Sequence, residues 1–343
     1  MTILSFKPGI ISRKLITPLD ERARIVVQSR FGIGDFPERK TLESIGDIYG
    51  ITRERVRQIE NASIEAIRKH PNFELTEPVF NELKETLEEK KGGVVAEHHF
   101  LESLSDDKQT KNHIHFLLVL GKPFIKIKED DYINHTWTTE EKKAKTVHDV
   151  LRALHKKVAK EETISEEELF SFLKKNLTEK FSDIPEEEIL RSWLHISKAV
   201  DKNILGEWGS AGSPIIHPKS TKDLAYLVLK KQGSPMHFSE VANFISNLFS
   251  RKAHSETVHN ELIKDGRFVL VGRGLYALNE WGYKPGVIRD VIADIIKSSG
   301  PLTKEEIVKR VLKERYVKEN TILVNLQNKN FFRRAQDRKY NIG

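Results

Sequence analysis

The chain has 343 residues, which is too long for one ordinary hydrophobic core and predicts two or more domains. Hydrophobic residues make up 38% and charged residues 31%, a balance typical of a soluble, helix-rich protein, and no apolar run is long enough to span a membrane. Because the sequence contains no cysteine, it excludes disulfide frameworks, thiolate zinc sites and cysteine nucleophiles.

The net charge of +7 is unevenly distributed. Residues 284–343 hold 14 Lys and Arg against 7 Asp and Glu, so the net charge of this segment is +7, the same as that of the whole chain. Residues 74–140 hold 8 basic and 14 acidic groups. This pattern excludes a uniform coat of nucleic-acid-binding charge and predicts basic surface near the two ends of the chain, with acidic surface between them. Residues 1–14 are predicted to be a basic tail without the apolar core of a secretory signal.

Residues 41–71 have the pattern of a helix-turn-helix. Apolar residues recur along one face of a short first helix, which Thr41 caps and Gly50 ends. That face comprises Leu42, Ile45, Ile48 and Tyr49. A second helix begins after Thr52 and ends before Pro71. Its predicted inner face comprises Val56, Ile59, Ser63 and Ile67.

The outer face of the second helix begins with residues suited to base recognition. Helix-turn-helix proteins place the start of the second helix against base edges, where Arg pairs with guanine, Gln with adenine and Glu with the cytosine amine. The predicted base-contacting residues are Arg53, Glu54, Arg57 and Gln58. The predicted phosphate contacts are Thr52, Arg55, Arg68 and Lys69. Taken alone, the same pattern also fits a solvated, charged helix face.

The stretch SRFGIGDFPERKTLESIGDIYGITRERVRQIENASIEAIRKHP closely resembles region 4 of housekeeping sigma factors. The resemblance covers about residues 15–72. It implies that Arg53, Glu54 and Gln58 contact bases of the −35 promoter element, with Arg55 and Arg57 in support. It also implies that the earlier helix, about Asp20–Phe31, binds the flap of the RNA polymerase β subunit. In that family the region that melts the promoter lies upstream, and fewer than 20 residues precede the domain here, so this region is expected to be absent.

The rest of the chain repeats. Phe124, Tyr132 and Trp137 have the same spacing as Phe268, Tyr276 and Trp281, and Phe332 and Tyr340 repeat the first two positions. In the helix ahead of each aromatic set, Ile114 and Leu118 align with Val258 and Leu262 and with Ile322 and Leu326. A degenerate unit is predicted between the first two sets, because ISEEEL at 164–169 matches LTKEEI at 302–307. The predicted units are residues 74–140, 146–216, 220–282 and 284–343.

Each unit has the pattern of three helices followed by a two-stranded hairpin, which is the order of a winged helix. The aromatic residues are best explained as hairpin core. The predicted fold is therefore mainly α: a helix-turn-helix domain followed by about four winged helices. Residues 220–282 resemble the HARE-HTH family, which includes the N-terminal domain of the bacterial RNA polymerase delta subunit. This resemblance implies a winged helix and a role connected with transcription.

The units are not expected to share one role. The third helix of the first unit, HIHFLLVL at 113–120, is mostly apolar and suits packing or a protein partner. Only the last unit has the polar and basic residues that DNA contact needs, although a solvated basic face is an alternative. Its predicted secondary DNA contacts are Asn325, Lys329, Arg333, Arg334, Arg338 and Lys339.

Sites for other chemistry are not evident. The thirteen histidines form no HExxH-like pair, and Gly272-Arg273-Gly274 belongs to no phosphate-binding loop, so we expect no enzymatic activity, metal, cofactor or small-molecule substrate. The favoured hypothesis is a cytoplasmic, nucleoid-associated transcription factor that binds double-stranded promoter DNA and core RNA polymerase. Two alternatives remain: a DNA-binding repressor or nucleoid protein that never contacts polymerase, and a winged-helix scaffold for protein partners.

Overall fold

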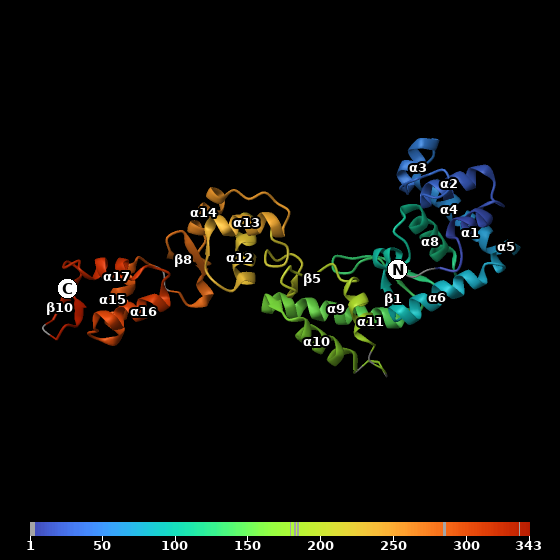
Figure 1. The fold of residues 1–343 in the computed structure, drawn as a ribbon. Coiled ribbons are helices and arrows are strands. Elements are labelled where there is room, and N and C mark those ends of the chain that lie inside the picture. Colours follow the sequence, from blue (N-terminus) through green and yellow to red (C-terminus); the bar gives the residue numbers. More distant parts are fainter. Residues whose placement is uncertain (1–3, 179, 182, 184, 284–285, 336) are drawn as a thin grey trace. The chain divides into compact units, whose positions relative to one another are not determined.

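A computed structural model describes residues 4–178, 180–181, 183, 185–283, 286–335 and 337–343. The chain forms two compact units, each described by itself below (Figure 1). Unit 1 comprises Met1–Lys202 and Glu207–Ala211, and unit 2 comprises Asn203–Gly206 and Gly212–Gly343. No helix among the described residues combines the length and the apolar character that crossing a membrane would need.

Unit 1 begins with a domain of five helices. These are α1 (Pro8–Ile16), α2 (Glu21–Phe31), α3 (Leu42–Tyr49), α4 (Arg53–Lys69) and the single turn α5 (Pro71–Glu74). Helices α3 and α4 form the predicted helix-turn-helix. Residues 1–14 are not a simple tail as expected, because α1 starts at Pro8 and buries Ser12, Leu15 and Ile16.

Two winged helices complete unit 1. Winged helix 1 consists of α6 (Glu77–Lys91), β1 (Val94–Ala96), α7 (Glu97–Leu104), α8 (Lys108–Leu120), β2 (Ile125–Ile127) and β3 (Thr136–Thr138). Winged helix 2 consists of α9 (Glu141–Glu161), β4 (Thr163–Ile164), α10 (Glu166–Thr178), α11 (Glu187–Leu194), β5 (Val200–Lys202) and β6 (Trp208–Ser210). In both, the last strand lies between the other two and pairs antiparallel with each.

Unit 2 contains two more winged helices. Winged helix 3 consists of α12 (Thr221–Gln232), β7 (Met236–His237), α13 (Phe238–Leu248), α14 (Ser255–Lys264), β8 (Phe268–Gly272) and β9 (Leu275–Leu278), followed by the 3₁₀ turn η1 (Asn279–Trp281). Winged helix 4 consists of α15 (Ile288–Ser299), α16 (Lys304–Glu314), α17 (Glu319–Leu326), β10 (Phe332–Arg334) and β11 (Tyr340–Ile342). In place of the first strand found in the other winged helices, it has a single β-bridge between Leu302 and Tyr340.

The predicted fold class, mainly α with a helix-turn-helix and four winged helices, is therefore confirmed. The paired apolar positions in the third helices are all buried. The prediction that the repeated aromatic residues form hairpin core is only partly confirmed, because Tyr132 is exposed in the loop between β2 and β3. That loop is longer than the turn between β8 and β9, so Trp137 on β3, rather than Tyr132, occupies the place that Tyr276 has on β9.

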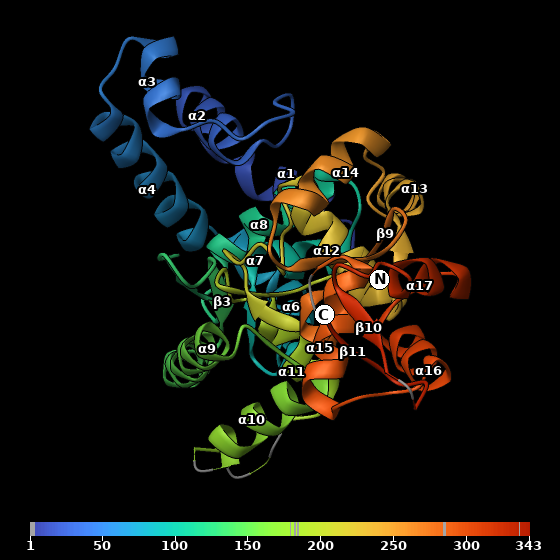
Figure 2. The ribbon, with the colours of Figure 1, turned by 90° about the vertical axis from the view of Figure 1, so that its left-hand side faces the viewer.

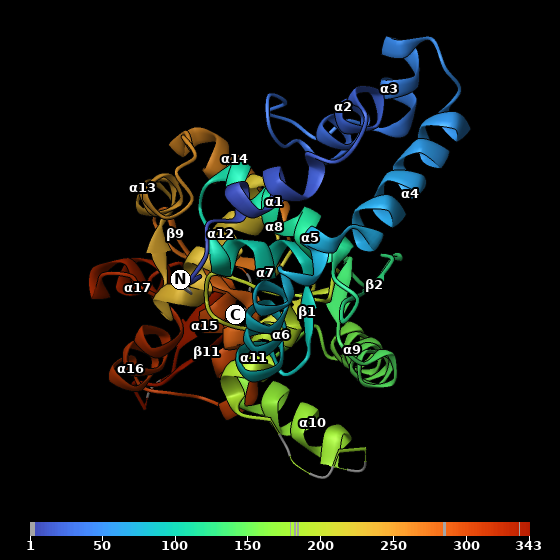
Figure 3. The ribbon, with the colours of Figure 1, turned by 90° about the vertical axis from the view of Figure 1, so that its right-hand side faces the viewer.

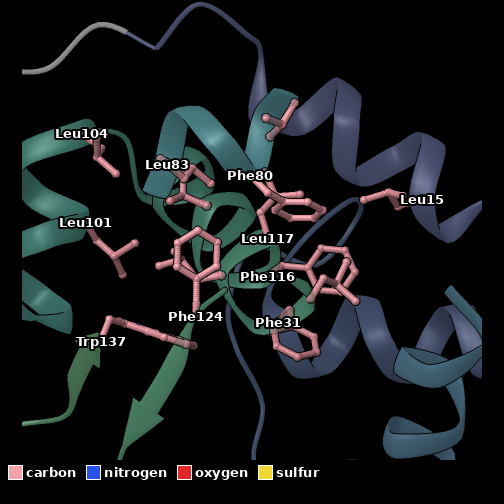
Figure 4. Close-up of a cluster of buried hydrophobic side chains, with 14 of the residues drawn as sticks. Leu15, Phe31, Phe80, Leu83, Leu101, Leu104, Phe116, Leu117, Phe124 and Trp137 are labelled. Atoms are coloured by element: carbon pink, nitrogen blue, oxygen red, sulfur yellow. The ribbon is translucent and has the colours of Figure 1, made fainter. Parts of the chain in front are cut away.

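The N-terminal domain and winged helix 1 share one hydrophobic core. Phe31 on α2 packs against Phe116 on α8, with ring centroids 5.0 Å apart. Leu15 from α1 lies in the same cluster as Leu83 and Trp137 of winged helix 1 (Figure 4). Since one continuous core serves both segments, removing either would expose apolar side chains of the other.

Polar contacts close the same junction. The loop after α2 runs beside α8, where the Asn112 side-chain amide donates to the Gly32 carbonyl at 2.9 Å and accepts from Arg39 Nε at 2.8 Å. Gly32 has a φ of +65°, and a Cβ there would lie 2.6 Å from Asn112 Nδ2, so both backbone angle and space require glycine. Lys108 at the start of α8 also pairs with Glu38.

Neighbouring winged helices are joined through backbone hydrogen bonds at the wing. In unit 1, Lys198 N donates to the Tyr132 carbonyl and Asn134 N donates to the Ile196 carbonyl. In unit 2, Tyr316 N donates to the Val271 carbonyl at 3.0 Å. In each pair, backbone of the following winged helix therefore covers part of the preceding wing.

Candidate nucleic-acid interface

The helix-turn-helix is defined by caps at both helix starts. The Thr41 hydroxyl accepts from Ser44 N at 3.1 Å, and the Thr52 hydroxyl accepts from Arg55 N at 3.2 Å. Gly50 ends α3 in the left-handed conformation, with a φ of +65°. These predicted boundaries are confirmed. Val56, Ser63 and Ile67 lie on the buried side of α4 as expected.

One prediction for α3 is wrong. Ile48 and Tyr49 were expected on its inner face, but they are 52% and 41% exposed. The helix is only eight residues long, and Ile45, with Leu42 partly buried beside it, makes the contact with Val26 of α2 and Val56 of α4. The last turn therefore projects beyond that small cluster. Tyr49 instead borders an open groove of about 670 Å³, together with Ile25 and Ile51.

The predicted base-contacting residues form an accessible surface at the start of α4. Arg53, Glu54, Arg57 and Gln58 are all exposed, and so are Thr52 and Arg55. In Figures 2 and 3 the turn between α3 and α4 lies at the end of unit 1 farthest from α9 and α10. The winged helices of unit 1 therefore leave this end of α4 open to a large ligand.

Side-chain hydrogen bonds pre-arrange this surface. Arg57 donates from Nε and Nη2 to the two carboxylate oxygens of Glu54, at 2.8 Å and 2.6 Å. Arg55 donates to Gln58 Oε1 at 3.1 Å. The hydrogen bond from Arg57 holds the pKa of Glu54 below its usual value, so Glu54 stays an acceptor at neutral pH. Base contacts by these residues would exchange internal partners for groups on the DNA.

Asn61 is a further residue of this surface that the sequence analysis did not single out. It is exposed and lies one turn beyond Arg57, on the same face of α4. Its amide has both a donor and an acceptor, the combination that matches an adenine edge. The i+4 spacing from Arg57 is the sequence signal that could have identified it.

Arg68 and Lys69, predicted together as phosphate contacts, have different environments. Lys69 is exposed. The Arg68 guanidinium donates from Nε to the Leu120 carbonyl at 3.1 Å and from Nη2 to the Val119 carbonyl at 2.9 Å. These are carbonyls of the last turn of α8, which have no acceptor role within the helix. Arg68 therefore joins α4 to winged helix 1, so its guanidinium is less available to a phosphate than that of a free surface arginine.

The third helices of the winged helices fall into two groups. On α8, residues 112–118 and Leu120 are buried, and the helix packs against α1 and α2. Helix α11 packs against α6 and β1, where Trp193 Nε1 donates to the Lys91 carbonyl at 2.9 Å. Helices α14 and α17 bury only two residues each. Residues 113–120 were expected to pack against other elements or a protein partner, and they pack against the N-terminal domain of this chain.

The predicted secondary DNA contacts lie on α17 and the wing of winged helix 4. Arg333, Arg334, Arg338 and Lys329 are exposed, and Lys339 is half-buried. Asn325 is half-buried, and its side-chain amide donates one hydrogen bond to the Thr321 carbonyl at 2.8 Å.

Acidic and histidine side chains among the described residues do not gather into a group of three or more that could hold a metal ion. The half-buried Glu97 has a structural role of this kind. It accepts hydrogen bonds from Trp137 Nε1 and from Lys126, and it contacts His115. Although burial opposes ionisation, the hydrogen bonds from His115 and Lys126 hold the pKa of Glu97 well below its usual range. This cluster stabilises winged helix 1.

Residues 15–69 match the family described as sigma-70, region 4. The match spans α2, the capped α3–α4 pair and the exposed face of α4. Residues 219–281, which are winged helix 3, match the HARE-HTH family, a helix-turn-helix domain whose description names ASXL and restriction endonuclease proteins.

Individual sigma factors are similar to the same N-terminal segment. RNA polymerase sigma factor SigA of Nostoc is 46% identical over 59 residues, which are 17% of this chain and 15% of that protein. RNA polymerase sigma factor RpoD of Helicobacter pylori is 44% identical over 54 residues, which are 16% of this chain and 8% of that protein. This chain thus spans only a small part of these relatives. No solved structure matches the chain. The similarities support a DNA-binding role associated with transcription.

Proposed function

We propose that this chain is a transcription factor that recognises −35-type promoter DNA through the start of α4 and associates with RNA polymerase. One observation carries the DNA part: the four side chains suited to base contact are exposed together at the open end of a capped recognition helix. The similarity of residues 15–69 to sigma region 4 supports the choice of promoter DNA.

The DNA part is tested with single alanine variants at Arg53, Glu54 and Gln58 on a duplex carrying TTGACA. Each is expected to lose about 1–3 kcal/mol of binding free energy and to relax the preference at one base pair, because a base-specific hydrogen bond is lost. Lys69→Ala is the control, since a phosphate contact should weaken specific and random duplexes alike. Equal losses on both duplexes in all four variants would contradict base recognition.

The polymerase contact has a restricted surface available to it. Val27 and Phe31 of α2, part of the segment expected to bind the β flap, lie under winged helix 1. An open groove of this domain is bordered by the apolar residues Ile25, Tyr49 and Ile51. We therefore assign the polymerase contact to this groove.

Co-purification with core polymerase in high salt tests the assignment. Tyr49→Ala combined with Ile25→Ser should abolish co-purification and leave DNA affinity nearly unchanged, because neither residue lies on the exposed face of α4. Retained co-purification would refute the groove as the contact.

The second candidate is a DNA-binding protein that works without polymerase. The observation in its favour is the same burial of Val27 and Phe31, because it removes much of α2 as a surface for another protein. Failure of the unmodified protein to co-purify with core polymerase, combined with normal DNA recognition, would favour this candidate.

A further inference from the structure

Winged helix 4 is open on the two elements with which winged helices contact DNA. The outer positions of α17 and of the following turn are exposed, including Asn320, Gln327 and Asn328. Within unit 1 the corresponding helices α8 and α11 are packed against other elements. The wings of winged helices 1 and 3 are partly covered by backbone of the next winged helix, whereas no such contact is found on β10 and β11 among the described residues.

The basic side chains of this wing project from a fixed hairpin. Phe332 is buried in the core and anchors β10, and the two residues that follow it, Arg333 and Arg334, are both exposed, on opposite faces of the strand. Arg333 pairs in register with Asn341, and Ala335 N donates to the Lys339 carbonyl at 2.8 Å across the turn. Arg338 lies in this turn with a φ of +63°. Four cations, from Arg333 to Lys339, therefore occupy one short hairpin.

Few acidic groups offset these cations. Asp337 is the one acidic residue of the wing, and its carboxylate is 4.0 Å from Lys339 Nζ. Arg334 also lies over the Tyr340 ring at 6.0 Å, which leaves its guanidinium edge open to solvent. Closely spaced guanidinium groups on a rigid hairpin suit the regular phosphates of a duplex, and α17 supplies polar rather than strongly base-specific side chains.

We infer that winged helix 4 is a second, largely sequence-independent site for duplex DNA, and that one chain can hold two duplex segments, one at α4 and one at this wing. The second half of the inference rests on the proposed recognition of DNA by α4. The two sites belong to different compact units.

Winged helix 1 does not extend the α4 site with exposed basic surface. The wing loop of winged helix 1 exposes Glu129, Asp130 and Asp131, and α6 exposes Glu85, Glu88 and Glu89. The recognition helices of winged helices 1 and 2 are unavailable because they are packed. Lys198, Arg152 and Lys84 pair with Glu129, Asp130 and Glu88, and the remaining carboxylates give a duplex bound at α4 little attraction to this part of winged helix 1.

The experiment uses two duplexes and the full chain. A biotinylated duplex carrying TTGACA is fixed to beads, and a fluorescent duplex of random sequence is offered in solution. The unmodified protein should retain the fluorescent duplex at least about tenfold above beads without protein. The triple variant Arg333→Ala, Arg334→Ala, Arg338→Ala should still bind the bead duplex but lose this retention. In direct titrations its log K against log salt slope should fall by about 0.9 for each phosphate contact removed.

A matched variant removes the same charge elsewhere. Lys304→Ala, Lys309→Ala, Lys313→Ala changes three exposed cations on α16, and it should retain the fluorescent duplex as the unmodified protein does. Equal losses in the two triple variants would overturn the assignment to the wing. Normal retention by the wing variant would overturn it as well and would assign these cations to an acidic protein partner.

Two further outcomes separate this inference from others. If the protein binds the random duplex through the wing but shows no preference for TTGACA, the proposed function fails while the second site stands. Retention also results if two chains associate, one binding the bead duplex through α4 and the other binding the random duplex through its wing. A mixture of the wing variant with an Arg53→Ala, Gln58→Ala variant restores retention only if chains associate, and such restoration would overturn bridging by one chain.

Discussion

The winged helices of units 1 and 2 use the same element in opposite ways. In unit 1 the third helices, α8 and α11, are packed against neighbouring elements, and α8 contributes Phe116 and Leu117 to a core shared with the DNA-binding domain. In unit 2 the third helices, α14 and α17, keep an open outer face. The difference shows that the winged-helix order fixes a scaffold, while the residues on the outer face of its third helix decide between packing and an external ligand.

The largest expected effect comes from placing a charge on each kind of helix. Phe116→Asp on α8 should lower the free energy of unfolding of unit 1 by at least about 4 kcal/mol, because it removes a buried ring and buries a carboxylate. Val324→Asp on α17, at a position 58% exposed, should change stability by no more than about 0.5 kcal/mol. Urea unfolding followed by tryptophan fluorescence reports on unit 1 through Trp137, Trp193 and Trp208 and on unit 2 through Trp281. Similar losses in the two variants would remove the distinction between the helices.

The second-largest expected effect is a loss of stability of unit 1 in acid. Burial lowers the pKa of His115 on α8 to about 4. His99 stacks on His195, which follows α11. Burial, together with nearby His195 and Lys91, lowers the pKa of His99 to about 4 as well. The folded state therefore holds neutral imidazoles, and stability is lost as pH falls from the unfolded pKa of about 6.5 towards 4. The loss should be on the order of 2 kcal/mol, mainly from the more deeply buried His115.

The measurement is the unfolding free energy of unit 1 between pH 7 and 4.5. His115→Gln should be less stable at pH 7, because it perturbs the contact with Glu97, but should show a smaller decline with acid. A flat profile in the unmodified protein would mean that these histidines accept protons without disturbing the packed helices.

A smaller effect is expected at the point where α4 meets α8. Arg68→Ala should lower the stability of unit 1 by about 1–2 kcal/mol, because two carbonyls of α8 lose their donor. Lys69→Ala removes a neighbouring cation without a comparable loss. DNA titrations provide the converse test: the salt dependence should flatten for Lys69→Ala and stay unchanged for Arg68→Ala. A flattened salt dependence in both would restore Arg68 as a phosphate contact.

The smallest effect is predicted for the packed helix of winged helix 2. Arg191 lies on α11, over the Phe170 ring and paired with Glu166. Arg191→Ala should leave DNA affinity within about twofold and cost less than about 1 kcal/mol of stability, since the pair is partly exposed. Equilibrium titration against the TTGACA duplex checks this, and a loss comparable to that of Arg53→Ala would place α11 on DNA.

Local signals in the sequence predicted much of this molecule. The capping threonines at 41 and 52 and the glycine at 50 defined α3 and α4 because these residues act through their immediate neighbours. The repeated apolar pairs identified the third helices, since their spacing follows the helical period.

Contacts between residues far apart in the sequence could not be predicted from those local signals. Arg68 resembles any basic residue near a helix end, and its carbonyl partners lie some 50 residues later in the sequence. The exposure of Tyr49 depends on how little of α3 the small cluster around Ile45 can cover. The insertion in the wing of winged helix 1 displaced Tyr132 from the position that an ungapped comparison assigned to it.

The core shared by α1 and α8 also constrains the order in which the chain can fold during synthesis. Leu15 and Ile16 leave the ribosome roughly 100 residues before Ile114 and Leu118, their companions in that core. Until α8 has emerged, Leu15, Phe31 and Ile67 lack the partners that complete their core, although the small cluster of Val26, Ile45 and Val56 can already form. The nascent chain therefore acquires a stable DNA-binding domain only after winged helix 1 has been translated.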